Sequence, residues 1–228
     1  MLASLPSHHR SAPYGQTTFM TFSPNSLTNN MWGWRFGFQL DELRRSYEAA
    51  REASDRDRIR IERQWSEFEA EVAAGRASFI EEDEEGRLIS DHGDHVGEML
   101  SEINGVLHVL REAFTISLHH FWERQLKSRM KVKEYKEAMA FAFLKDQGIT
   151  PNEPMLTALR LTANVAKHSE GNSADHLFIL HPDLFDVTEM TKWDAEPSHE
   201  YLKITDELLN HFFSAVRDSG PTGKAIWS

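Results

Sequence analysis

The sequence contains no cysteine, which excludes disulfide bonds, thiolate nucleophiles and metal sites with sulfur ligands. Because small secreted domains usually depend on disulfides, this absence favours a reducing compartment such as the cytoplasm. Glycine and proline are also scarce, with 12 and 8 among 228 residues, while 40% of the residues are hydrophobic and 27% are charged. This composition is that of a globular chain, and it excludes fibrous and disordered classes.

No apolar stretch approaches the ~20 residues that a membrane-spanning helix needs, and the N-terminus lacks the pattern of an export signal. We therefore expect a cytoplasmic protein that does not enter the membrane. Cations are in the minority, since 25 Lys and Arg stand against 36 Asp and Glu, for a net charge of −11. Nucleic acid is not attracted to such a chain as a whole, so any binding must use a local basic groove.

The hydrophobic pattern predicts an all-α protein, a helical bundle with long antiparallel helices and no strand. The expected helices cover residues 40–74, 90–129, 132–147, 154–169, 173–181 and 198–218. Residues 51–60, in the first of these, are nearly all charged, which fits either one long helix or a break between two. The acidic run at residues 81–86 is predicted to be a loop.

Residues 1–38 are predicted to be an N-terminal arm, outside a single helical domain at residues 39–228. The first 30 or so residues mix Ser, Pro, Asn and Thr without periodicity, which is typical of an extended segment. Residues 31–38 contain two Trp and two Phe, which should dock on the body or on a second subunit. Stacking on bases is the alternative, but it usually needs interleaved cations, and only Arg35 is present.

Residues 159–168 carry the clearest sign of chemistry. At 100° per residue, four polar side chains fall within about a 100° arc of one helix face, namely Arg160, Asn164, Lys167 and His168. This set suits a phosphodiester, because Arg and Lys neutralise phosphate oxygens, Asn positions a hydroxyl, and His transfers a proton near neutral pH. RNA supplies its own 2′-hydroxyl nucleophile, so no metal and no cofactor is expected. The alternative is that the cations are surface charges and His168 a helix C-terminal residue.

Two segments together resemble the HEPN superfamily of helical bundles, namely residues 118–127 and the helix that carries Arg160 and His168. The resemblance covers roughly residues 90–216. It implies a metal-independent endoribonuclease of a toxin–antitoxin or antiviral defence system, with RNA as substrate and a homodimer as the active form. The roles that it implies are catalysis by Arg160 and His168, substrate positioning by Asn164 and Lys167, and orientation by Glu123, His119 or His120.

The motif departs from the commonest HEPN form in two ways. Ala163 stands where that form has Arg directly before Asn164, and seven residues separate Arg160 from His168 where the family has four to six. Two other functions therefore stay open. One is a catalytically inactive helical interaction protein, such as an antitoxin, sensor or assembly partner of another protein. The other is an acidic nucleic-acid mimic that acts as an inhibitor, which the net charge and the run at residues 81–85 suggest.

Three further groups have competing interpretations. Asp91-His92-Gly93-Asp94-His95 offers metal ligands, but its place at a predicted helix start favours capping by Asp91. Glu123 can form an ordinary ion pair with Lys127, four residues along the same helix. His119 and His120 lie about 100° apart on that helix, so we expect one to pack in the core and the other to face a cleft.

Overall fold

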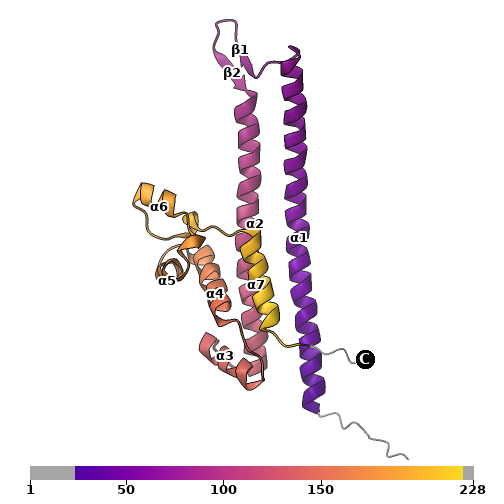
Figure 1. Ribbon diagram of the computed structural model, residues 1–228, viewed down its shortest axis with the longest axis vertical. Coiled ribbons are helices and arrows are strands. Elements are labelled where there is room, and N and C mark those ends of the chain that lie inside the picture. The colour runs from indigo at the N-terminus through magenta and orange to yellow at the C-terminus, as the bar shows by residue number, and fades with distance from the viewer. Residues whose placement is uncertain (1–23, 223–228) are drawn as a thin grey trace, which may run out of the picture.

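The computed structural model describes residues 24–222, and within this range almost all of the ordered backbone is helical (Figure 1). The elements are α1 (Pro24–Ala73), β1 (Ile80–Glu82), β2 (Leu88–Asp91), α2 (His92–Met130), α3 (Glu137–Asp146), α4 (Glu153–His168), α5 (Asn172–Leu180), α6 (Val187–Trp193) and α7 (Asp206–Asp218). Short 3₁₀ turns cover Pro182–Leu184 and His199–Tyr201. The predicted all-α helical bundle is confirmed.

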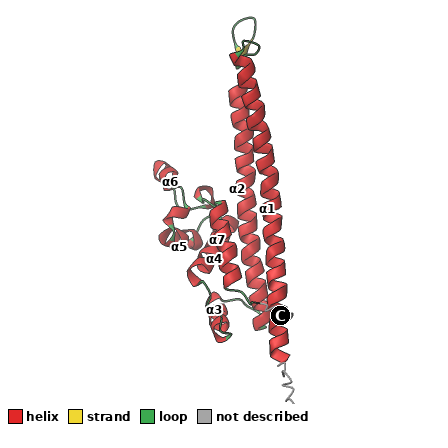
Figure 2. Ribbon diagram, turned by 45° about the vertical axis from the view of Figure 1, so that its right-hand side comes forward, coloured by secondary structure: helices red, strands yellow, loops and turns green. Residues whose placement is uncertain are grey.

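Helices α1 and α2 run antiparallel, side by side, and the β1–β2 hairpin joins them at the tip (Figures 1 and 2). With 50 and 39 residues, these helices are about 75 and 60 Å long. The charged stretch at residues 51–60 does not interrupt α1, so the one-helix alternative is the observed one. Polar contacts replace apolar packing there, for example where Arg58 Nη2 donates to Asn104 Oδ1 at 2.7 Å.

The remaining helices pack around the end of α2 that is far from the β-hairpin, and α7 contacts both α2 and α1 (Figure 1). This body contains two adjoining hydrophobic clusters. The larger joins α1, α2, α3, α4 and α7 around fully buried Phe36, Trp122 and Phe212. The smaller joins α4 and α5 to the segments around α6. Helix α4 contributes to both clusters, so packing on two sides fixes its position.

The prediction of an extended arm is wrong for residues 24–38, which form the first turns of α1, and residues 1–23 lie outside the described part. The predicted domain boundary after Phe38 falls inside this helix. The aromatic segment does dock on the body, as expected, because Phe36 is buried and Trp32 packs against the core. Burial of these rings stabilises the first turns of α1, where the amino-acid composition alone does not favour a helix.

The prediction that residues 81–86 form a loop without strands is wrong at its start, since Glu81 and Glu82 belong to β1. Strand β1 pairs antiparallel with β2, with Ile80 opposite Asp91, and Gly86 takes the positive φ of 75° that the connecting turn requires. Both strands are too short for an alternating pattern to be visible in the sequence. They close the tip of the long helical hairpin.

Two predicted helices begin later than expected, and α6 was not predicted. Helix α3 starts at Glu137 and not at residue 132, because α2 ends at Lys131 in a left-handed conformation and a short loop follows. The last helix starts at Asp206 with Thr205 as its cap. The apolar residues before it, Leu202 and Ile204, are buried in extended chain, which the helical spacing did not reveal. No helix in the described range is long and apolar enough to cross a membrane.

Candidate functional site

Helix α4 presents the polar face that the sequence predicted. The Asn152 side chain caps the helix by accepting from the Met155 N–H, and Pro154 occupies its first turn. Leu159, Leu161 and Val165 are buried on the packed sides. Of the four polar residues on the remaining side, Arg160 and Asn164 are half-buried, while Lys167 and His168 are exposed. The packing therefore leaves this strip partly open to solvent.

Arg160 has a strong partner within the protein. Its Nε donates to Glu137 Oε2 of α3 at 3.0 Å, and Thr157 Oγ1 donates to the same oxygen at 3.3 Å. Glu137 is only 19% exposed, so this ion pair is less screened than one on the open surface. The pair holds the Arg160 side chain near the α3–α4 contact. Nothing in the sequence pairs these two residues, which lie 23 positions apart.

The two residues proposed for catalysis are not adjacent. Arg160 and His168 are eight residues apart, which separates their Cα atoms by about 12 Å along the helix axis. His168 is the last residue of α4, and Asn164, between them, donates to Ser173 Oγ of α5 at 3.5 Å. Within one chain, Arg160 and His168 can meet a single phosphate only if it lies between them, over Asn164 and Lys167.

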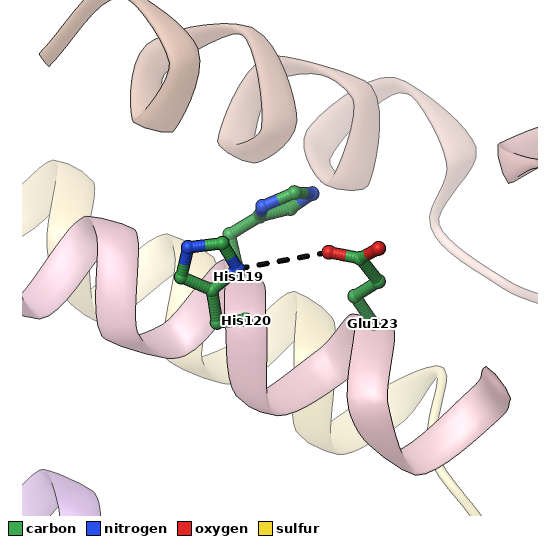
Figure 3. A group of neighbouring side chains, drawn as sticks. All are labelled: His119, His120 and Glu123. Atoms are coloured by element: carbon green, nitrogen blue, oxygen red, sulfur yellow. Dashed lines mark ion pairs between the residues drawn. The ribbon is translucent and has the colours of Figure 1, made fainter. Parts of the chain in front are cut away.

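Helix α2 brings three further predicted residues to this region. His119 is 9% exposed, so the expectation that one of the two histidines packs in the core is confirmed. The His120 side chain is 43% exposed, and its predicted place in a cleft stays a prediction. His120 Nδ1 lies 3.6 Å from Glu123 Oε2, one turn along the helix (Figure 3). Glu123 thus pairs with His120 and not with Lys127, the partner that the alternative interpretation gave it.

Electrostatic effects link the α2 and α4 groups. Burial lowers the pKa of His119 to about 4, with the charges of Arg160 and Lys167 acting in the same direction and that of Glu123 opposing them. His119 is therefore a neutral imidazole at neutral pH. Tyr135 lies nearby, and burial, together with the charge of Glu137, raises the pKa of its hydroxyl. Residues that are far apart in the sequence thus gather where α2, α3 and α4 meet.

His119, His120 and Glu123 are also the group that could hold a metal ion in the described part of the chain. Their ligand atoms lie within 4.8 Å of one another, and imidazole with carboxylate is a donor set that zinc accepts. However, the positive charges of Arg160 and Lys167 act on His119, and they would repel a metal cation bound there. These two effects oppose each other, and we assign no metal to the group.

The candidate metal ligands at residues 91–95 have a structural role. Asp91 accepts hydrogen bonds from the backbone N–H groups of Gly93 and Asp94, and so it caps α2, as the alternative interpretation predicted. His92 packs against Phe68 with the two rings tilted and their centroids 4.9 Å apart. The acidic run nearby is partly neutralised, because Arg87 pairs with Asp83 at 2.7 Å and with Glu85 at 2.9 Å. This weakens the case for a nucleic-acid mimic.

Ala163, at the position where the commonest HEPN motif has Arg, is 2% exposed and lies on the packed side of α4. A long cationic side chain would not fit there without displacing the core. No protein-family model, no curated protein and no solved structure matches the chain. The functional argument therefore depends on the geometry of the chain itself.

Proposed function

We propose that the chain is a HEPN-like, metal-independent endoribonuclease of a defence or toxin–antitoxin system, acting as a homodimer in the cytoplasm. The observation that carries the proposal is the open polar face of α4, which presents two cations, an amide and an imidazole on one side of a helix anchored by two core clusters. The neutral His119 of α2, close to Arg160 and Lys167, adds a second imidazole at the edge of this face. Fixed cations next to imidazole suit phosphodiester cleavage.

In the proposed reaction, the 2′-oxygen of RNA attacks the adjacent phosphorus while the bond from phosphorus to the 5′-oxygen breaks. The 2′-hydroxyl proton passes to a neutral imidazole, and the leaving 5′-oxygen takes a proton from a protonated one. The products are a 2′,3′-cyclic phosphate and a 5′-hydroxyl. His168 would be the base or the acid, and Arg160 would stabilise the charge that develops on phosphate, with Asn164 and Lys167 as positioning residues.

Arg160 and His168 are about 12 Å apart along α4, and a homodimer could bring one of each to the same phosphate. If two α4 faces meet across a two-fold axis, Arg160 of one protomer and His168 of the other could reach one phosphate. This arrangement is isologous, so it would generate two equivalent sites. The exposure of both Lys167 and His168 leaves room for such a contact.

A second function is favoured by a specific observation. A catalytically inactive member of such a family would lack the motif Arg, and the buried Ala163 stands at that position. Arg160 would then have a structural role, in the ion pair that joins α4 to Glu137 of α3. The chain would then be a helical interaction protein, such as an antitoxin, sensor or assembly partner. In this alternative His168 has no chemical role.

The test is cleavage of a mixed RNA pool by purified protein in excess chelator. We expect the wild type to leave 2′,3′-cyclic phosphate ends, and His168→Ala and Arg160→Gln each to reduce the rate at least 100-fold. The matched controls are His211→Ala on α7 and Arg63→Gln on α1, both at exposed positions, and they should cleave like the wild type. Absence of cleavage by a dimeric wild type, with and without added metal, would favour the interaction protein.

Glu137→Gln separates the two roles of Arg160. It removes the ion pair but keeps the guanidinium, so a catalytic Arg160 predicts cleavage at the wild-type rate or faster. If Arg160 only holds α3 on α4, Glu137→Gln and Arg160→Gln should lower the melting temperature alike and change cleavage alike. Melting temperatures of the two variants, measured beside the rates, identify which role applies.

A further inference from the structure

The end of α2 and the loop that follows are basic, in contrast to the chain as a whole. Residues 124–136 contain six cations and one carboxylate, whereas the net charge of the protein is −11. The cations are Arg124, Lys127, Arg129, Lys131, Lys133 and Lys136. Cations suit a helix C-terminus, but α2 ends at Met130 and the charges continue beyond the last turn. The helix dipole therefore does not account for all of them.

Part of this basic segment lines a groove between α2 and the N-terminal part of α1, which we name the α1–α2 groove. Two adjoining hollows make it up, and both are lined by Gln39, Gln125 and Ser128. Its other lining residues are Met31, Trp32, Arg35, Glu42, Leu43, Ser46, Ser117, Phe121, Arg124, Arg129 and Lys131. Four cations and one carboxylate thus border it, which gives this part of an acidic protein a local excess of positive charge.

Aromatic rings stand beside these cations. The Arg129 guanidinium lies over the Trp32 ring, 5.1 Å from its centroid, and both residues line the groove. On the outer side of α1, Trp34 and Phe38 stack with centroids 5.7 Å apart and are 67% and 47% exposed. Phe38 is three residues from Arg35, a lining residue, so its ring lies beside the groove, and Trp34 extends the stacked pair away from it. Residues 31–38 contain one cation, Arg35, and the fold places Arg124, Arg129 and Lys131 across the groove from this segment.

We infer that the α1–α2 groove binds single-stranded RNA, with phosphates on Arg35, Arg124 and Lys131 and a base stacked on the Trp34–Phe38 pair. Cations that follow a channel and exposed rings at its lip are the two components by which proteins hold single strands. A lipid surface also attracts cations and Trp, but it is flat, whereas these cations lie along a groove between two helices. The geometry therefore favours a strand over a bilayer.

The choice of RNA as the strand rests on the proposed function, and helix α2 contributes residues to both regions. Arg124 Nε donates to the backbone oxygen of His120 at 3.2 Å, and His120 in turn pairs with Glu123 beside the α4 face. Arg124, which lines the groove, and His120 are thus one turn apart on α2. In this arrangement the groove holds the RNA and the α4 face cleaves it.

The experiment is fluorescence anisotropy of a labelled 12-nucleotide single-stranded RNA, measured across salt concentrations with full-length protein carrying His168→Ala to prevent cleavage. In that background, Arg35→Gln with Lys131→Gln should weaken binding at least tenfold. It should also reduce the slope of log K against log salt by about 1.4, because each phosphate contact contributes roughly 0.7. Trp34→Ala should weaken binding roughly tenfold and leave the slope unchanged.

The matched control removes the same charge from the far half of α1, by Arg56→Gln with Arg63→Gln, both at exposed positions. It should bind RNA like its parent. Equal losses in the groove and control variants, no binding at all, or binding to anionic lipid vesicles but not to RNA would each overturn the inference. Binding through the groove without any cleavage by the wild type would contradict only the proposed function, and cleavage without groove-dependent binding only this inference.

Discussion

At the residue scale, Asp206 organises a polar cluster that joins α1, α2 and α7. Tyr47 and Arg111 donate to its Oδ1, the latter at 2.7 Å, and Arg51 lies 3.5 Å from Oδ2. Partial burial alone would raise the pKa of Asp206, but these hydrogen bonds and charges outweigh it and lower the pKa. Burial and the neighbouring carboxylate raise the pKa of Tyr47 to about 12. The folded state therefore favours a protonated Tyr47 beside an ionised Asp206.

This cluster predicts how stability changes at alkaline pH. The pKa of Tyr47 is raised above its ordinary value of 10, so its contribution is complete below pH 10 and is lost as the pH rises toward 12. We expect the free-energy difference of unfolding between wild type and Tyr47→Phe to shrink by roughly 2 kcal/mol over that interval. Urea titrations of both proteins at pH 8, 10 and 12 measure it. Parallel curves for the two proteins would contradict the prediction.

Some site residues could be predicted from the sequence and others could not, for reasons that these contacts make plain. The face of Arg160, Asn164, Lys167 and His168 follows from helical periodicity, which is a local property. The partner of Arg160 does not, because Glu137 lies on α3 and tertiary structure brings it within 3.0 Å of Arg160. The neutrality of His119 likewise depends on burial by elements distant in the sequence. Tertiary neighbours set these properties.

At the element scale, the helix ends that were predicted accurately are those marked by a capping residue or a glycine. The start of α2 was expected at residue 90 or 91 and lies at His92 with Asp91 as cap. The third helix was expected to end at residue 147, and α3 ends at Asp146, shortly before Gly148 with its positive φ of 76°. The start of α7 was misplaced, because buried Leu202 and Ile204 continue its apolar spacing through a non-helical segment. Periodicity alone does not distinguish buried extended chain from helix.

The cap of α2 gives a test at this scale. Asp91→Ala removes both hydrogen bonds to the first turn, and we expect it to lower the free energy of unfolding by about 1 kcal/mol. Asp91→Ser should keep most of that stability, because a hydroxyl can cap but is a poor ligand for a divalent metal. Thermal melts with and without zinc distinguish the two interpretations. A zinc-dependent shift in the wild type that Asp91→Ser abolishes would contradict the capping role.

At the scale of the whole molecule, the chain divides into a packed body and a projecting two-helix hairpin. The larger core cluster uses α1 up to Tyr47 and α2 from Leu110 onward, so the far halves of both helices lie outside it. Beyond these points, Ile61 and Leu107 are the buried apolar residues in the described parts of α1 and α2. Rings of Trp65, Phe68 and Phe79 pack near the tip. The projecting part of the two-helix hairpin is thus held mainly by contacts within the hairpin, and not by the core of the body.

This division predicts that the body folds without the far part of the hairpin. Replacing residues 62–99 by a Gly/Ser loop of about four residues joins Ile61 to Leu100 and leaves the core clusters and the α1–α2 groove intact. We expect the melting temperature to change by less than about 5 °C, since little buried apolar area is removed. Leu118→Ala, in the fully buried core, should instead cost about 2–5 kcal/mol. Circular dichroism melts of both variants test this contrast. A truncated chain that fails to unfold cooperatively would show that the hairpin belongs to the same folding unit, whereas a stable one would leave the hairpin free for a separate role.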